Sequence, residues 1–435
     1  MEKIVSLAKR RGFIFPGSEI YGGLAGTWDY GPMGVELKNN IKQVWWKKFV
    51  QNRDDVVGID AAIIMNPRVW EASGHVQTFT DPLVECKTCH ERFRADHKDA
   101  MVEHEQWHIK KKESAVWSEA RQFNLLFRTF VGAVEDSASQ TYLRPETAQA
   151  MFVNFKNVLD TARPKLPFGI AQIGKAFRNE ITPGNFIFRS REFEQMEIEY
   201  FVRSGEWEQH FDYWLGEMRS WIAMLGIEKK DIHELKVPKD ELAHYSKRTV
   251  DFEYEFPFGK KELYGLACRG DFDLKNHTKA SGTELVYTDD TGEKTVPYVI
   301  EPTWGVDRTV LAVLLANYRE DVNEKGLRVF LKLPAILAPY KVAVFPLVGN
   351  KEHITEKARG VYESLKSHMS VAWDARGNIG KRYYSQDEIG TPFCVTVDYQ
   401  TLEDDTVTVR DRDSAAQERI ALSELRSYIQ DKLSI

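Results

Sequence analysis

The stretch GIAQIGKAFRNEITPGNFIFRSREFEQMEIEYFV, residues 169–202, carries the strongest fold signal of the chain. Its pattern predicts two antiparallel strands joined by a loop. In the second strand, Met196, Ile198, Tyr200 and Val202 alternate with polar residues, as in a strand with one buried face. The alternate positions of the two strands and their loop carry polar or aromatic side chains, namely Gln172, Arg178, Glu180, Arg189, Arg191, Phe193, Gln195 and Glu197.

A sheet face of this composition suits a nucleotide. Guanidinium groups bind phosphates, an aromatic ring stacks on a base, and carboxylates accept hydrogen bonds from amines. The alternative is an ordinary amphipathic hairpin whose polar face is only solvated. The residues of this hairpin alone leave both interpretations open.

The bulk properties indicate an ordinary globular protein. The chain has 435 residues, 43 % of them hydrophobic and 29 % charged, which suffices for two or three domains. We expect no membrane association and a cytoplasmic location, because the sequence has no long apolar run and no signal-peptide core at its start. The net charge of −6 disfavours broad nonspecific binding to nucleic acid, and four cysteines do not suggest a disulfide framework.

Hydrophobic spacing predicts the elements before the hairpin. Residues 33–51 indicate an amphipathic helix and residues 56–65 a strand that ends near Pro67. Residues 84–122 are polar and charge-rich, and we expect a helical insertion there. A second, helical insertion is expected at about 205–250.

The C-terminal part changes in character after residue 335. A strand at 295–300 leads to a helix that begins at Gly305, and the proline-containing stretch 333–340 predicts a domain boundary. Strands then alternate with helices, which indicates a small α/β domain with a mixed sheet. We therefore expect a domain over 1–335 and a second domain over 336–435.

Three segments carry a family resemblance. The order F-R-N-E, a loop, then F-R-S-R-E-F resembles motif 2 of class II aminoacyl-tRNA synthetases. LRPETAQ (143–149), FRNEITPGNFIFRSREFEQMEIEYF (177–201) and QDEIGTPFCVTVDYQTLEDDTVTVRDRD (386–413) are similar to the dimeric bacterial type of glycyl-tRNA synthetase. The helix, strand and proline before residue 68 resemble motif 1, and Gly305 with Arg308 resembles motif 3. The similarity extends over nearly the whole chain.

This resemblance implies an α+β fold: a class II antiparallel sheet flanked by helices, then an α/β anticodon-binding domain with a mixed sheet. It implies a ligase that activates glycine with ATP and Mg²⁺ and transfers it to the 3′ end of tRNA(Gly). The expected partners are tRNA(Gly), glycine, ATP and a second copy of the chain. The alternative from another class is a catalytically altered, synthetase-like RNA-binding paralogue, which would have no need of the motif residues.

The resemblance also implies roles for particular residues. Arg178 would bridge the α-phosphate and the glycine carboxylate, Glu180 would accept a hydrogen bond from adenine, and Arg308 would hold the γ-phosphate. Phe193 would stack on the purine, Arg189 and Arg191 would reach the outer phosphates, and Glu262 and Glu301 would bind Mg²⁺. The expected ATP-binding set is Arg178, Asn179, Glu180, Phe188, Arg189, Ser190, Arg191, Glu192, Phe193, Glu262, Leu263, Gly305, Val306, Asp307 and Arg308.

Recognition of glycine requires carboxylates for the ammonium group and bulk that excludes larger side chains. The expected glycine-binding set is Arg94, Glu146, Phe193, Glu194, Gln195, Met196, Glu197, Arg269, Glu301, Pro302, Thr303, Trp304 and Gly305. These acids, together with the bulk of Trp304, disfavour a ligase for alanine or serine. The chain departs from the family pattern at Ala150 and Thr303, and at Gly270 in the run Arg269-Gly270-Asp271.

The sequence leaves the role of two further groups of residues open. Cys86, Cys89, His104 and His108 have the zinc-like spacing C-x2-C-x14-H-x3-H, but a lone C-x2-C is often the remnant of a lost site and H-x3-H on a polar helix is usually a solvated face. We therefore include no metal ligand in the expected site. In the C-terminal domain, the residues that could contact anticodon bases or phosphates are Arg382, Tyr383, Tyr384, Gln386, Asp387, Glu388 and Arg410.

Overall fold

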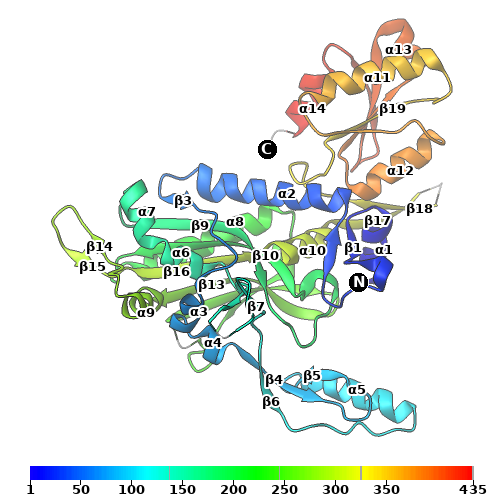
Figure 1. The fold of residues 1–435 in the computed structure, drawn as a ribbon. Helices are drawn as coiled ribbons and strands as arrows, with labels where there is room; N and C mark the ends of the chain where they lie inside the picture. Colours follow the sequence, from blue (N-terminus) through cyan, green and yellow to red (C-terminus); the bar gives the residue numbers. More distant parts are fainter. Residues whose placement is uncertain (137, 244, 324–325, 434–435) are drawn as a thin grey trace.

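The computed structural model describes residues 1–435 except 137, 244, 324–325 and 434–435. Figure 1 shows a body built on a large sheet, a C-terminal domain beyond it, and an insertion that projects from the opposite side of the body. Among the helices of the described residues, none is both long and apolar enough to cross a membrane.

The sheet of the body has seven strands in the order β11-β12-β13-β16-β10-β9-β3. Neighbouring strands run antiparallel, except for β3 with β9. The predicted hairpin is β9 and β10, and its register joins Glu192 to Phe177 at the loop end. The bounds are β3 Val56–Gly58, β9 Phe168–Phe177, β10 Glu192–Val202, β11 Ile232–Lys236, β12 Arg248–Phe256, β13 Gly259–Gly270 and β16 Tyr298–Gly305. An antiparallel sheet with flanking helices confirms the predicted fold class.

One face of this sheet is closed by helices α2 (Pro32–Trp46), α8 (Trp207–Met224) and α10 (Val306–Asn317). The predicted apolar face of β10 lies here, with Met196 and Ile198 fully buried. Large rings fill the space beneath the helices, and Trp304 packs 4.9 Å from Phe49 and 5.4 Å from Trp45 between ring centroids. Because this face is densely packed, a ligand has to approach the sheet from its other face.

The other face is covered at one end by α6 (Ala148–Val153), α7 (Phe155–Ala162) and α9 (Phe272–Ser281), through a cluster that includes Phe155, Phe168 and Phe201. Figure 1 shows α2 along one side of the sheet and α9 with α3 on the other. Smaller elements surround the body: α1 Glu2–Arg10, β1 Ile14–Pro16, β2 Trp28–Tyr30, α3 Pro67–Ala72, α4 His75–Thr78, β7 Arg128–Phe130, β8 Gln140–Tyr142, β14 Tyr287–Thr288, β15 Lys294–Thr295, β17 Tyr318–Asn323 and β18 Gly326–Leu331.

Three expected elements differ from the structure. The strand predicted over 56–65 ends at Gly58, where the chain leaves the edge of the sheet. The insertion is only partly helical: α5 (Lys98–Lys110) lies against a sheet of β4 (Thr80–Glu85), β5 (Arg92–Arg94) and β6 (Arg121–Asn124). The segment 205–250 begins with α8 but ends in β11 and the start of β12. Strands this short or this polar carry too few alternating positions to be recognised.

The C-terminal domain has the predicted mixed sheet, in the order β20-β19-β21-β22-β23. β19 runs parallel to β20 and β21, and the remaining pairs are antiparallel. Its own core begins at Val342, which agrees with a separate folding unit. The bounds are β19 Val342–Pro346, α11 Glu352–Lys366, β20 Val371–Trp373, α12 Ile379–Ile389, β21 Phe393–Val397, α13 Tyr399–Asp404, β22 Thr406–Asp411, β23 Gln417–Ala421 and α14 Leu425–Leu433.

Candidate active site

The polar face of β10 presents Gln195, Glu197 and Glu199 in a row, because they alternate with the core residues of the same strand. The register with β16 places Glu197 opposite Thr303. The Thr303 hydroxyl donates to Oε1 of Glu197 at 2.8 Å, and the Thr147 hydroxyl, just before α6, donates to Oε2. Glu197 is thus a buried carboxylate held in one orientation from both sides.

Further acids surround Glu197. One carboxylate oxygen from each of Glu197, Glu199 and Glu301 lies within 4.8 Å of the others. Arg269, at the end of β13, donates to Glu301 at 2.5 Å and to Asp273 at 2.7 Å. We refer to this group as the acid cluster, defined as Glu146, Glu197, Glu199, Asp273 and Glu301 with Arg269.

The acid cluster has more carboxylates than cations, and this affects the pKa of its members. The pKa of Glu301 is raised to about 8: burial is the largest cause, Arg269 opposes it, and the charges of Glu197 and Glu146 add to it. Burial, with Glu301 and Glu197 nearby, also raises the pKa of Glu199 well above its usual range. Neither carboxylate oxygen of Glu199 has a hydrogen-bond partner within the described chain. A bound cation would relieve this excess of negative charge.

Two acids of the cluster remain partly accessible. The side chains of Glu146 and Glu301 are 16 % and 14 % exposed, whereas Glu199 is fully buried. Burial opposes ionisation of Glu146, but His75, at 3.3 Å, and Arg269 outweigh it and lower the pKa of that carboxyl. An ammonium group that enters the cluster would therefore meet one ionised carboxylate and a second whose ionisation it favours.

Arg178 lies at the loop end of the same face. Its guanidinium contacts the rings of Phe79 and Phe193, 5.4 and 5.2 Å from their centroids, and Nε donates to the Pro145 carbonyl at 3.0 Å. In the part of the chain that the structure describes, Arg178 has no carboxylate within ion-pair distance. An unpaired guanidinium fixed by two rings is well suited to an anionic ligand.

Glu180 and Arg191, which flank the same loop, differ in whether their polar groups already have hydrogen-bond partners in the protein. Oε2 of Glu180 is buried and has no hydrogen-bond partner among the described residues, and Nε of Arg189 lies 4.0 Å away. This oxygen can accept a hydrogen bond from an amine, as expected. Arg191 instead donates to the carbonyls of Ala25 at 2.5 Å and Glu180 at 3.1 Å, so it fastens the loop rather than reaching outward. The expected role of Arg191 at the outer phosphates is not supported here.

Arg308 stands in the first turn of α10, with its guanidinium 4.4 Å from the centroid of Phe188. Nη1 pairs with Oε2 of Glu262 at 3.1 Å. Asp251 is close by: oxygens of Asp251 and Glu262 both lie 3.7 Å from the point where a Cβ on Gly265 would stand. Burial, then repulsion from Glu262 and Glu253, raises the pKa of Asp251 to about 7. These oxygens fit the preference of Mg²⁺ for hard ligands.

The expected pairing of Glu262 with Glu301 at one magnesium ion is wrong. Glu301 is opposite Ala267 in the β13–β16 register, and Glu262 lies five positions further along β13. At about 3.3 Å per residue, roughly 16 Å separates them along the sheet. Glu301 belongs to the acid cluster, and Asp251 is the carboxylate that we overlooked beside Glu262.

Four expected glycine-binding side chains point to the opposite face of the sheet. Met196 and Trp304 are fully buried in the core beneath α2 and α8. Glu194 pairs there with Lys38 at 2.9 Å and Lys42 at 3.0 Å. Pro302 shares the parity of Trp304, because alternate residues of a strand face opposite sides. Trp304 therefore does not restrict the size of a ligand at the acid cluster.

Several expected ATP-binding residues also serve the protein itself. Asp307 accepts a hydrogen bond from the Glu194 backbone at 2.8 Å and one from Tyr30. Asn179 donates its backbone N–H to Leu125, and the Ser190 hydroxyl donates to the Glu192 carbonyl. Leu263, Val306 and Phe188 are buried in the core, and Glu192 pairs with Lys175. Gly305 is the residue that precedes α10.

Arg94 does not contact the acid cluster. It lies on β5 of the insertion and pairs with Asp81 and Asp96, each at 2.7 Å. The Asp96 hydrogen bond raises the pKa of Arg94, burial opposes this, and the charges of Asp81, Asp96 and Glu180 raise it further. Arg94 is thus nearer to the Glu180 end of the site than to the glycine end assigned from the sequence.

At each position where the chain departs from the family pattern, the residue present suits its local conformation or contact. Ala150 is buried within helix α6, a backbone conformation that alanine adopts without strain. Thr303 keeps a hydroxyl donor for Glu197. Gly270 has a φ of +61° at a β-bulge between β13 and β16, where a branched side chain such as threonine would be strained.

Sequence reasoning missed several members of this network. Gln149 donates to Glu146 at 3.1 Å and to Asp273 at 3.0 Å, and it contacts His277 at 2.8 Å. Glu199 had a visible signal, since it continues the alternation of Gln195 and Glu197. His75, Asp273 and His277 had none, because they come from helices whose approach to the sheet depends on the tertiary fold.

Several of the C-terminal residues expected to contact the anticodon bond within the protein instead, and Asp387 with Arg410 forms a joint with the body. Asp387 of α12 is fully buried and accepts hydrogen bonds from Arg328 of β18 at 2.8 Å and from Arg410 at 2.8 and 3.0 Å. We call these three residues the C-terminal joint. Glu388 pairs with Arg10 and Arg11 of the N-terminal region, and Arg382 is buried against the carbonyls of Pro346 and Leu347. Arg382, Asp387, Glu388 and Arg410 therefore bond within the protein, and the expectation that they contact tRNA is corrected; these contacts leave the expectation for Tyr383 and Tyr384 as it stood.

Comparisons with known proteins agree with this geometry. Residues 131–318 match the family described as the tRNA synthetase class II core domain (G, H, P, S and T), and residues 341–432 match the anticodon binding domain. Similar curated proteins are the glycine–tRNA ligases of Alkaliphilus oremlandii (54 % identical), Thermobifida fusca (52 %) and Geobacillus kaustophilus (51 %). Each comparison covers 100 % of this chain and 98–99 % of the relative. The chain therefore belongs to the glycine–tRNA ligase family.

Proposed function

We propose that this protein is a glycine–tRNA ligase of the dimeric bacterial type. It activates glycine with ATP to glycyl-adenylate and transfers the glycyl group to the 3′ end of tRNA(Gly). The observation that carries the proposal is the layout of one sheet face, with an excess of acids at one end and the unpaired Arg178 at the other. This layout complements an amino acid whose ammonium and carboxylate groups point in opposite directions.

In the first step, a glycine carboxylate oxygen attacks the α-phosphorus of ATP. A new O–P bond forms, the bond from the α-phosphorus to the bridging oxygen breaks, and pyrophosphate leaves. Arg178 lowers the repulsion between the two anions, because its planar donors can engage a carboxylate and a phosphate oxygen together. Glu180 accepts a hydrogen bond from the adenine amino group, which fixes the nucleotide for in-line attack.

At the far end of ATP, Arg308 holds the outer phosphates and orients the leaving group. Glu262 and Asp251 would hold Mg²⁺, which when bound supplies positive charge to the phosphate oxygens. The acid cluster holds the glycine ammonium, through Glu146 and Glu301. In the second step, the terminal ribose hydroxyl of tRNA attacks the glycyl carbonyl carbon, and AMP leaves.

Selection of glycine would follow from the crowding around its α-carbon. The Thr303 methyl and the Thr147–Glu197 contact lie beside the ammonium site, so we expect an added methyl group to clash there. Rejection by a clash is sharper than rejection by a lost contact, so a separate editing site is not required.

The dimer and the tRNA contacts belong to the same proposal. The segment after β3, expected to form the dimer interface, exposes 37 % of Ile63 and 50 % of Ile64, an apolar surface suited to a second copy. In the anticodon-binding domain, which we assign to residues 336–435, a hollow of 650 Å³ is lined by Tyr383, Tyr384 and Thr396 among others. Its aromatic rings could stack on an unpaired base.

Because charged tRNA is used in translation, we expect the enzyme in the cytoplasm.

The test is ATP–pyrophosphate exchange with glycine, alanine and serine in separate reactions. We expect exchange with glycine only, and a loss of about 10³-fold in Arg178→Ala with an unchanged melting temperature. Exchange with alanine or serine at a comparable rate, or none with glycine from a folded protein, would contradict the proposal. Light scattering of the same sample measures whether the chain is a dimer.

A further inference from the structure

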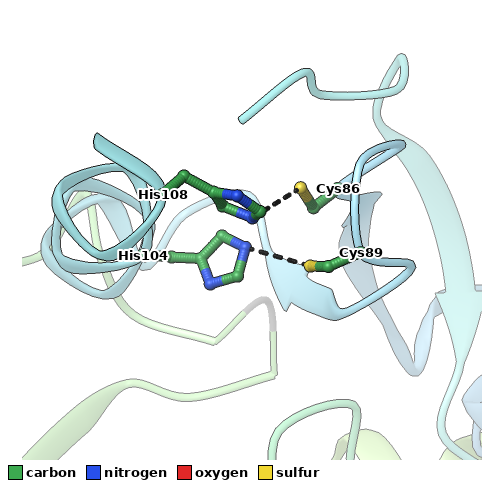
Figure 2. A group of neighbouring side chains, drawn as sticks. All are labelled: Cys86, Cys89, His104 and His108. Carbon is green, nitrogen blue, oxygen red and sulfur yellow. Dashed lines mark hydrogen bonds between the residues drawn. The ribbon is translucent and has the colours of Figure 1, made fainter. Parts of the chain in front are cut away.

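Four side chains of the insertion converge on one point, far along the chain from the acid cluster (Figure 2). Sγ of Cys86 lies 3.6 Å from Nε2 of His108, and Sγ of Cys89 lies 3.4 Å from Nε2 of His104. One potential ligand atom from each of the four residues lies within 4.8 Å of the others. Two sulfur and two nitrogen donors therefore surround a common centre.

The secondary structure explains this convergence. The cysteines lie in the turn between β4 and β5, and the histidines lie four residues apart on one face of α5. His108 is fully buried and His104 is 7 % exposed, although the other residues of α5 are exposed or half-buried. The interpretation of these histidines as a solvated helix face is therefore wrong.

The second nitrogen of each imidazole is also held. Nδ1 of His108 lies 2.9 Å from a carboxylate oxygen of Glu113, and Nδ1 of His104 lies 3.4 Å from one of Glu91. These contacts favour the tautomer that carries the proton on Nδ1 and leave the Nε2 lone pair directed at the centre. A carboxylate behind a ligating imidazole is the usual arrangement in zinc proteins.

Beyond the packing of Phe93, His104 and Trp117, the insertion buries little apolar surface. None of the hydrophobic core clusters of the described residues includes a side chain from residues 87–122. Apolar residues of α5 instead face outward, with Val102 49 % and Ile109 68 % exposed. Modules of this size that bury so little apolar surface usually depend on a metal or a disulfide. A Cys86–Cys89 disulfide would leave the two buried histidines without a role.

We propose that Cys86, Cys89, His104 and His108 bind one Zn²⁺ ion in a tetrahedral site that stabilises the insertion. Two thiolates with two imidazoles are typical of structural zinc, and four protein ligands leave no open position for catalysis. The site would fix the β4–β5 hairpin and with it Arg94 on β5. It does not depend on the proposed aminoacylation function.

The test measures metal in the full-length protein purified in the presence of zinc. We expect about one zinc ion per chain by mass spectrometry, and less than about a tenth of this in Cys86→Ser/Cys89→Ser and in His104→Ala/His108→Ala. The matched control is His90→Asn, which changes a histidine beside Cys89 but keeps a residue that tolerates its φ of +64°. The control should retain the wild-type zinc content.

A second measurement covers the case in which the double variants do not fold. His108→Cys should still bind metal, and its cobalt form should show stronger thiolate charge-transfer absorption than the wild type, because three sulfurs replace two. Chelation of the wild type should expose residues 84–122 to limited proteolysis while the body stays intact. A zinc-free wild type, or identical cobalt spectra for wild type and His108→Cys, would overturn the proposal.

Discussion

The acid cluster and the C-terminal joint both bury carboxylates beside arginines, but in opposite proportions. In the joint, two guanidinium groups saturate the oxygens of the single carboxylate, Asp387. In the acid cluster, one guanidinium, from Arg269, serves several carboxylates, and Glu199 has no hydrogen-bond partner among the described residues. A saturated group holds two parts of a protein together, whereas an incomplete one is suited to a ligand.

The largest effect should come from breaking the joint. Asp387→Ala leaves the buried Arg410 without its carboxylate and Arg328 with Asp321 alone, so we expect a loss of about 3–5 kcal/mol in the free energy of unfolding. The KM for glycine in pyrophosphate exchange should stay unchanged, because β22, which carries Arg410, belongs to a different sheet from the acid cluster. Calorimetry measures the loss, and the exposed Asp413→Ala is the control. A raised KM would show that the two regions are coupled.

The dependence of glycine activation on pH tests the acid cluster, whose carboxylates outnumber its cations. Glu301, with a pKa of about 8, must release a proton to hold an ammonium group. The kcat/KM for glycine should therefore rise about tenfold from pH 6 to 7 and level off above pH 8. Pyrophosphate exchange at saturating ATP measures this profile. A flat profile would mean that Glu301 is already ionised without glycine.

Glu199→Gln should change the dependence of stability on pH. A raised folded pKa means that the native state keeps a proton which the unfolded state loses above its usual value of 4.5. The wild type should therefore lose about 1.4 kcal/mol per pH unit from this group as pH rises above about 5, and the amide variant should not. Urea unfolding between pH 5 and 8 measures both slopes, with the exposed Glu192→Gln as control. Equal slopes for Glu199→Gln and wild type would contradict the raised pKa.

The smallest effect should come from Thr303→Ser. The serine keeps the hydroxyl that donates to Glu197, so the KM for glycine should change by less than about threefold. Thr303→Val keeps the volume but removes the donor, which should cost about 1–3 kcal/mol in glycine activation. If the two variants behave alike, the hydroxyl has no part in orienting Glu197.

The sequence predicted what depends on local pattern. The alternation in residues 192–202 identified β10 and its two faces, and the spacing in 33–51 and 305–321 identified α2 and α10. It could not place residues whose neighbours come from distant segments. Glu194 was assigned to the glycine site as an acid for the ammonium group and Trp304 as bulk that excludes larger side chains, although strand parity turns both toward the core. Asp387 and Arg410 were assigned to tRNA as polar residues of the anticodon-binding domain. Their burial against Arg328 could not be predicted, because it depends on how two domains meet.

Strand β16 joins the two ends of the site without a hinge, from Glu301 to Gly305 just before Arg308. A one-residue insertion in that strand would exchange its faces, turning Glu301 into the aromatic core and an apolar side chain toward the substrate. The kinds of mutation that β16 tolerates are therefore limited. Substitutions such as Thr303 can accumulate along β16, but changes in its length cannot, because the same eight residues specify both the core and the chemistry.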